Sequence, residues 1–146
     1  MPLRRCLIAV LLIASVAVRA QQPAPAGMSL ADAAARRFPQ PVRVGDLLRR
    51  QVLQPIESQP TLGWVRGVVQ RADGSIDVVV HHGGAFGLFT RPIAVPVDAM
   101  ALLGQYMEII DFTPGQLARF KTFDGAGATA LPPDSVIRVG LARPSH

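Results

Sequence analysis

The fold is decided by residues 62–82: Leu62 to Gln70 reads LGWVRGVVQ, and Ile76 to His82 reads IDVVVHH. Both runs are rich in valine, and the second begins with isoleucine; these β-branched residues favour β-strands. Ala72 to Ser75 (ADGS) lies between them, and its Asp-Gly pair supplies the positive φ angles of a tight turn. We therefore predict an antiparallel hairpin here.

On the C-terminal side of this hairpin, short apolar runs alternate with turn residues, which is typical of a compact all-β unit. Gly83-Gly84 predicts a chain reversal. The prolines that bracket residues 92–96 (PIAVP) cannot donate ladder hydrogen bonds, which predicts a strand at an edge or at a barrel rim. The further expectations are a strand-like run at Phe86 to Phe89, a helical turn at Asp98 to Leu103, a strand at Tyr106 to Ile110, a loop at Gly125 to Pro133 and a last strand at Ser135 to Leu141.

On the N-terminal side, Val42 to Leu48 and Arg50 to Leu53 are predicted strands. Two short helices are also expected. One begins at Ser29, where Ser-x-x-Asp is a helix start, and ends before Pro39. The other begins at Thr113, where Thr, Pro and Gln form a capping box. The fold class is therefore mainly β, with one or two short helices.

The first twenty residues have the three parts of a secretory signal: a basic start, an apolar run from Leu7 to Val18 and a small-residue exit at Ala20. A run of this length is too short to cross a bilayer, which requires about 20 helical residues. We predict cleavage after Ala20, a periplasmic or secreted protein and no integral membrane anchor. Cys6, the one cysteine, precedes the apolar run and leaves with the signal.

The predicted organisation has four parts: the signal peptide at 1–20, a Pro/Ala linker and short helix at 21–37, the β domain at 38–124 and a C-terminal extension at 125–146. The whole chain has a formal charge of +5. Three arginines leave with the signal, so twelve basic residues face ten acidic ones and the charge falls to +2. The remaining arginines are scattered, including the pairs Arg36-Arg37 and Arg49-Arg50. Because no basic stripe is present, we predict that nucleic acid is not a partner.

The order of these signals resembles the PRC-barrel domain family, found in the H subunit of bacterial photosynthetic reaction centres and in a ribosome maturation factor. The residues that carry the resemblance are Val44-Gly45-Asp46-Leu47-Leu48, Gly63-Trp64-Val65-Arg66-Gly67-Val68-Val69, Asp73-Gly74, Gly83-Gly84, Arg91-Pro92-Ile93-Ala94-Val95-Pro96 and Asp98-Ala99. It covers about Phe38 to Asp124.

The resemblance implies a small PRC-barrel-like (SH3-like) β-barrel that mediates contacts and has no catalytic residue set. The signal peptide and low charge separate this chain from the ribosome-binding members. It also lacks the transmembrane helix of the reaction-centre subunit. The resemblance therefore predicts an exported, non-enzymatic domain for protein-protein binding or scaffolding in the cell envelope, with an unidentified protein partner.

The sequence contains no recognisable set of catalytic residues. After signal cleavage the chain has no thiol, and no serine lies in a Gly-x-Ser-x-Gly turn. Glu108 and Asp111 would lie on opposite faces of a strand, so they do not form a carboxylate pair. Gly83-Gly84 is not followed by a phosphate-loop pattern. We predict no enzymatic activity and no cofactor.

His81 and His82 suggest an alternative function, an envelope protein that binds a metal or small ligand together with the Phe86 to Phe89 loop. Successive strand side chains point to opposite faces, so the two histidines cannot chelate one ion while the strand continues through them. A site would need further ligands such as Asp77 or His146. Surface or rim histidines are therefore the favoured interpretation.

The candidate binding residues are Trp64, Phe86, Leu88 and Phe89. Strand alternation would place Leu62, Trp64 and Val68 on one face, with Gly63, Val65, Gly67 and Val69 on the other. For Trp64 we favour a packing role, in the core or at its rim, over a role as a binding anchor. If Trp64 and Phe86 to Phe89 are exposed together, they form a partner surface.

Overall fold

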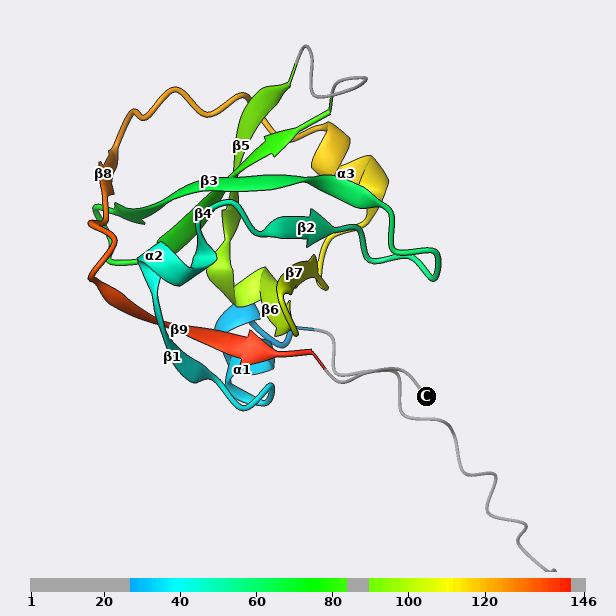
Figure 1. The fold of residues 1–146 in the computed structure, drawn as a ribbon, viewed down its shortest axis with the longest axis horizontal. Coiled ribbons are helices and arrows are strands. Elements are labelled where there is room, and N and C mark those ends of the chain that lie inside the picture. Colours follow the sequence, from blue (N-terminus) through cyan, green and yellow to red (C-terminus); the bar gives the residue numbers. More distant parts are fainter. Residues whose placement is uncertain (1–26, 84–89, 143–146) are drawn as a thin grey trace, which may run out of the picture.

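The computed structural model describes residues 27–83 and 90–142, and it is mainly β, as the sequence predicts. Nine strands form one mixed sheet in the order β1-β9-β6-β7-β2-β3-β4-β5, and β8 pairs with β3 (Figure 1). The strands are β1 (Gln40–Arg43), β2 (Gln51–Leu53), β3 (Thr61–Arg71), β4 (Ile76–His82), β5 (Arg91–Pro96), β6 (Met100–Leu103), β7 (Tyr106–Ile109), β8 (Ala128–Ala130) and β9 (Val136–Leu141).

The hairpin of β3 and β4 is confirmed. Gly74 has a φ of 86°, the left-handed conformation that the turn requires, and its N–H donates to the carbonyl of Arg71. The Asp73 carboxylate accepts a hydrogen bond from the Ser75 N–H at 2.9 Å, and this side-chain contact stabilises the turn. Val65, Val68, Val78 and Val80 from the two strands belong to the hydrophobic core cluster.

Within the described residues the sheet is mixed and does not close, so the barrel expected from the family resemblance is not confirmed. β6 pairs parallel with β9 and β2 pairs parallel with β7, whereas the other pairs are antiparallel. β1 and β5 are the two ends of the strand order, and within residues 27–83 and 90–142 they do not pair with each other. β5 carries Pro92 and Pro96, so the predicted edge position of this strand is confirmed.

Both predicted helices form. α1 (Leu30–Ala35) begins after Ser29, whose hydroxyl accepts from the Asp32 N–H. α3 (Pro114–Ala118) has the complete capping box of Thr113 and Gln116. Its single fully buried residue, Leu117, enters the core cluster, and the Arg91 guanidinium donates to the carbonyls of Ala118 and Phe120 at its other end.

The predicted strand from Val42 to Leu48 is wrong in its second half, which forms α2 (Val44–Leu47). Val44 and Leu47 are both buried, and their spacing of three residues suits one helical turn. The N–H groups of Val44 and Gly45 donate to the carbonyls of Ser135 and Pro133. The helical turn therefore depends on a segment ninety residues away in the chain.

Two other expectations need correction. The helical turn expected at Asp98 to Leu103 is limited to a 3-10 turn, η2 (Val97–Ala99), because residues 100–103 pair with β7 as β6. The expected loop from Gly125 to Pro133 contains β8, which pairs with residues 69–71 of β3. In both cases a strand partner overrides weak local preference.

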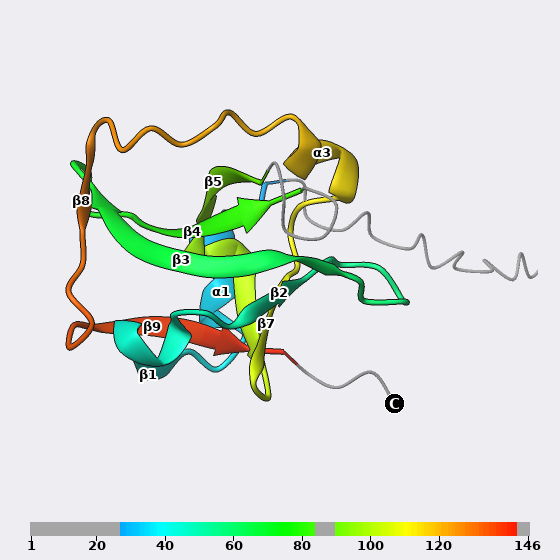
Figure 2. The same cartoon turned by 45° about the horizontal axis from the view of Figure 1, so that its top comes forward.

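The largest fully buried side chains include residues of α2, β5, β6, β7 and α3: Leu47, Ile93, Met100, Met107, Ile109 and Leu117. Outside this cluster, the chain after α3 passes along β3, β4 and β5 on its way to β8 (Figure 2). Its Phe123 N–H donates to the carbonyl of Pro92, and its ring stacks on Arg71, which is itself paired with the buried Asp77 at 2.7 Å. This crossing therefore contacts β5 at Pro92 and β3 at Arg71.

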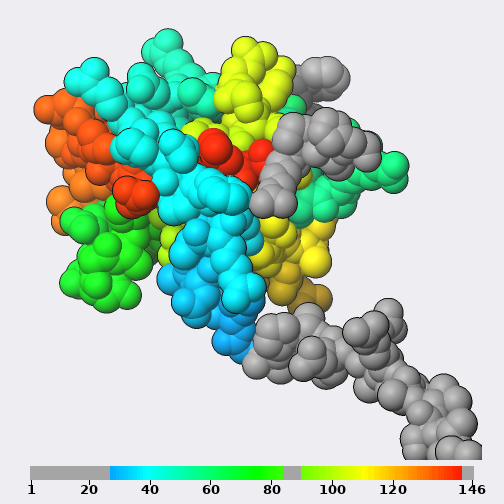
Figure 3. Space-filling view, turned by 90° about the horizontal axis from the view of Figure 1, so that it is seen from below, coloured from blue at the N-terminus to red at the C-terminus, as the bar shows by residue number. Residues whose placement is uncertain are grey.

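α1 and the chain after it lie on the surface beside β9 (Figure 3). Arg37 fixes this segment, because its guanidinium binds both oxygens of the Asp111 carboxylate at 2.7–2.8 Å and also donates to the carbonyl of Asp98. Both side chains of the ion pair are largely buried. The N-terminal helix is thus anchored to the far end of β7 and to η2.

Candidate functional site

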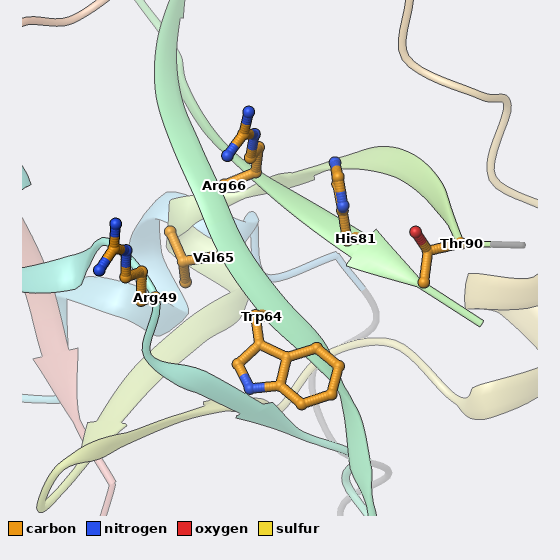
Figure 4. A pocket seen from close by; sticks show the side chains of 6 residues that line it. All are labelled: Arg49, Trp64, Val65, Arg66, His81 and Thr90. Atoms are coloured by element: carbon orange, nitrogen blue, oxygen red, sulfur yellow. The ribbon is translucent and has the colours of Figure 1, made fainter. Parts of the chain in front are cut away.

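A groove of about 480 Å³ opens beside the Trp64–His81 pair of the β3–β4 hairpin. We call it the Trp64 groove. Residues from β3, β4 and the chain preceding β2 and β5 line it: Arg49, Trp64, Val65, Arg66, His81 and Thr90 (Figure 4). In this view Arg49 and Arg66 lie on opposite sides of the β3 ribbon.

Trp64 is exposed over 43% of its surface and is therefore not a core residue. It lies directly opposite His81 in the β3–β4 ladder, so the two side chains project from the same face of the sheet. A tryptophan with this exposure on a rigid central strand is a suitable contact residue for a ligand or partner.

The alternation predicted along β3 is wrong, because the strand contains two register shifts. Opposite β2, Leu53 pairs with Thr61 and Val52 with Gly63, so Leu62 is an extra residue and turns into the core. Opposite β4, the register changes between Val65 and Gly67. As a result Trp64 faces outward while Val68 is in the core, although alternation places them together.

The second shift also determines how Arg66 is presented. Arg66 is the extra residue of this bulge and has no partner in the β4 ladder. Bulged residues commonly re-aim a side chain towards a functional site. The bulge leaves Arg66 exposed beside Trp64 and returns Val68 to the core.

Arg49 enters the groove from the chain between α2 and β2. Its φ is 66°, a left-handed conformation that costs a non-glycine residue on the order of 1 kcal/mol. Two hydrogen bonds hold it there: the Arg49 N–H donates to the Val65 carbonyl, and the Val65 N–H donates to the Arg50 carbonyl. Strained residues of this kind are concentrated at functional sites.

The side chains of Arg49 and Arg66 make no hydrogen bond or ion pair with any residue that the structure describes. Several other arginines already have partners. Arg37 forms an ion pair with Asp111, Arg71 forms one with Asp77, and Arg91 donates to the carbonyl of Ala118 at the end of α3. The Trp64 groove therefore presents two guanidinium groups that are available to an anionic group.

A second groove of about 350 Å³ lies next to the first and shares Arg49 with it. We call it the Tyr106 groove. Its lining residues are Leu48, Arg49, Arg50, Gln51, Gln105 and Tyr106. Arg50 is held in place here, because its guanidinium donates to the carbonyls of Asp46 and Gly104 at 2.7 and 2.9 Å.

The two predicted histidines do not act together. His81 lines the Trp64 groove, whereas His82 lies opposite Gly63 and Arg91 and lines neither groove. Partial burial, and secondarily the positive charge of Arg91, lower the pKa of His82 below its ordinary value of 6.5. Asp77, the suggested third ligand, is paired with Arg71. Among the described residues no group of three or more His, Cys, Asp or Glu side chains could hold a metal ion.

Phe86, Leu88, Phe89 and His146 lie outside the described residues. The carboxylates considered for catalysis are engaged elsewhere, since Asp111 pairs with Arg37 and Glu108 accepts from the Gln59 amide at 3.4 Å. Sequence reasoning missed Arg49 and Arg66 as site residues. The proximity of Arg66 to Trp64 in the sequence was a usable signal, but Arg49 reaches the groove only through the fold.

No family model, curated protein or solved structure matches this chain. Among the residues that the structure describes, no helix is both long and apolar enough to cross a bilayer.

Proposed function

We propose that this chain is an exported, non-enzymatic, PRC-barrel-like domain that binds a protein partner in the cell envelope. The support for export is the signal-like sequence of residues 1–20. The support for the family is the order of motifs along residues 38–124, and a mainly β sheet with short helices is compatible with it. N-terminal sequencing of the exported protein should begin near Gln21.

The main support for a binding function is the exposed side chain of Trp64, which lies in a groove with Arg49 and Arg66, two arginines without a side-chain partner in the described residues. Tryptophan and arginine are the residue types most enriched among the few that dominate binding energy in protein interfaces. Leaving a large apolar ring in water is unfavourable, by roughly 25 cal/mol per Å² of apolar surface, so covering it favours association.

Site-specific photo-crosslinking tests this function. A photoreactive phenylalanine analogue at position 64 should form one or a few discrete adducts when the protein is exposed to a native envelope extract. The matched control places the same analogue at Gln70, which is exposed on the same strand but lines neither groove. Identical adducts at both positions, or no adduct at position 64, would contradict the proposal.

A further inference from the structure

We infer that the Trp64 groove and the Tyr106 groove form one continuous surface that binds an extended acidic peptide segment of the partner. The inference rests on the proposed function and specifies the chemistry of the segment that is recognised. Arg49 lines both grooves, so a ligand that occupies one of them meets the other at this residue.

The charge of the groove lining suits an acidic ligand. The lining of the two grooves includes Arg49, Arg50 and Arg66 and contains no aspartate or glutamate. The guanidinium groups of Arg49 and Arg66 have no partner within the described part of the chain. A guanidinium binds a carboxylate through two parallel hydrogen bonds, so each of these arginines can take one acidic side chain.

The other lining groups suit a peptide. Trp64 and Tyr106 supply one aromatic surface in each groove. Thr90, Gln51 and Gln105 carry hydroxyl and amide groups that can pair with the N–H and C=O groups of an extended backbone. Alternate side chains of such a backbone point the same way, so acidic residues at every second position can reach the arginines together.

The surface is organised before the ligand arrives. The backbone of Arg49 is held by its hydrogen bond to Val65, and Arg50 is fixed by its contacts with Asp46 and Gly104. Trp64 lies between Gln51 of β2 and His81 of β4, and Arg66 follows Val65, whose backbone is hydrogen-bonded to Arg49 and Arg50. Fixing these groups in advance lowers the entropy lost on binding.

A polynucleotide fits this surface less well. Single strands are bound by successive stacked aromatic rings and by a basic track along many phosphates. Each groove here has one aromatic ring, and of the three arginines that line the grooves only Arg49 and Arg66 have no side-chain partner in the described part of the chain. One aromatic ring per groove and two available guanidinium groups suit a short acidic peptide better than a long run of phosphates.

Trp64 is the only tryptophan of the chain, so its fluorescence reports directly on the groove. The probe is a peptide of about twelve alternating Glu and Ala residues, about 40 Å long when extended. It should change the Trp64 emission saturably, and added salt should weaken its binding. The same peptide with Gln in place of Glu should produce no saturable change.

Single substitutions locate the binding. Arg49→Gln and Arg66→Gln should each weaken binding of the acidic peptide by about tenfold, the loss expected for one charge-assisted pair. The control Arg36→Gln removes the same charge from the exposed C-cap position that follows α1 and lines neither groove, and it should leave the affinity unchanged. Equal weakening by all three variants would overturn the inference, because net charge alone would then explain the binding.

Peptide length tests continuity. Tyr106→Leu should weaken the long peptide and leave a peptide of about four residues unaffected, since the short one fits within the Trp64 groove. Equal effects on both would show that the grooves are not one surface. Saturation by inorganic phosphate with the affinity of the peptide, or tighter binding of oligothymidylate, would also overturn the inference. If position 64 forms crosslinks while the acidic peptide does not bind, the binding function stands and the acidic ligand is wrong.

Discussion

Gly63 determines how closely β3 and β4 approach beside the Trp64 groove. A Cβ atom at this position would overlap the backbone carbonyl oxygen of His81 and lie 2.7 Å from the carbonyl carbon. These are backbone atoms, so they cannot move aside without displacing the strand. The neighbouring Gly67 differs, since nothing lies within 4 Å of the corresponding Cβ position.

We therefore expect Gly63→Ala to lower the free energy of unfolding by about 3 kcal/mol, the upper part of the range for overpacking. The control Gly67→Ala should change it by less than about 1 kcal/mol, because its methyl group enters open space. Urea denaturation of the two variants measures the difference. Similar stability of both variants would mean that the close approach at Gly63 is not required.

His82 should make stability depend on pH. Partial burial, together with the charge of Arg91, lowers its pKa in the folded chain, whereas the unfolded chain binds a proton near the ordinary value of 6.5. As the pH falls, the unfolded state therefore gains its proton first. The stability that neutral His82 contributes to the folded chain is therefore fully present above pH 6.5, and it is lost as the pH falls through the lowered pKa of the folded state.

The test compares the chain with His82→Gln by urea denaturation at about pH 7.5, 6.5 and 5.5, which brackets the titration of an ordinary histidine. The stability of the unsubstituted chain should fall more steeply than that of the variant over this range. Parallel curves would show that His82 does not carry the dependence, and a relative gain in stability on acidification would contradict the sign of its pKa shift.

At the scale of elements, the features predicted from sequence are those that carry their own local signal. The hairpin has Asp73-Gly74, α3 has Thr113 and Gln116, and the edge strand β5 has its two prolines. Each of these residues restricts the backbone through its own geometry or a hydrogen bond within a few positions. Such signals do not depend on the rest of the chain.

The elements that sequence reasoning misassigned depend on distant partners. α2 is fixed by carbonyls of Pro133 and Ser135, and β6 is fixed by its pairing with β7 and β9. The candidate site shows the same limit. The exposure of Trp64 follows from two register shifts in β3, and Arg49 reaches Trp64 through a hydrogen bond to Val65. The alternation of side chains along a strand predicts neither a register shift nor a hydrogen bond to a distant residue.

At the scale of the whole molecule, residues 125–142 complete the sheet. β9 joins β1 to β6, and its Ile137 and Val139 belong to the core cluster. β8 covers one edge of β3, and the carbonyls that hold α2 also come from this segment. Without these residues β1 has no partner and α2 loses two of its hydrogen bonds.

A chain of residues 27–124 should therefore not fold, whereas residues 27–142, which keep every described contact of the C-terminal segment, should. Burial of two core aliphatic residues contributes about 1.5–3 kcal/mol each, and the lost strand pairs add to this. Such a loss is comparable with the 5–15 kcal/mol that stabilises a typical domain. Amide dispersion in NMR spectra and the cooperativity of thermal unfolding distinguish the two chains. Cooperative unfolding of residues 27–124 at a similar temperature would contradict this prediction, because the C-terminal segment would then be an appendage that the fold does not require.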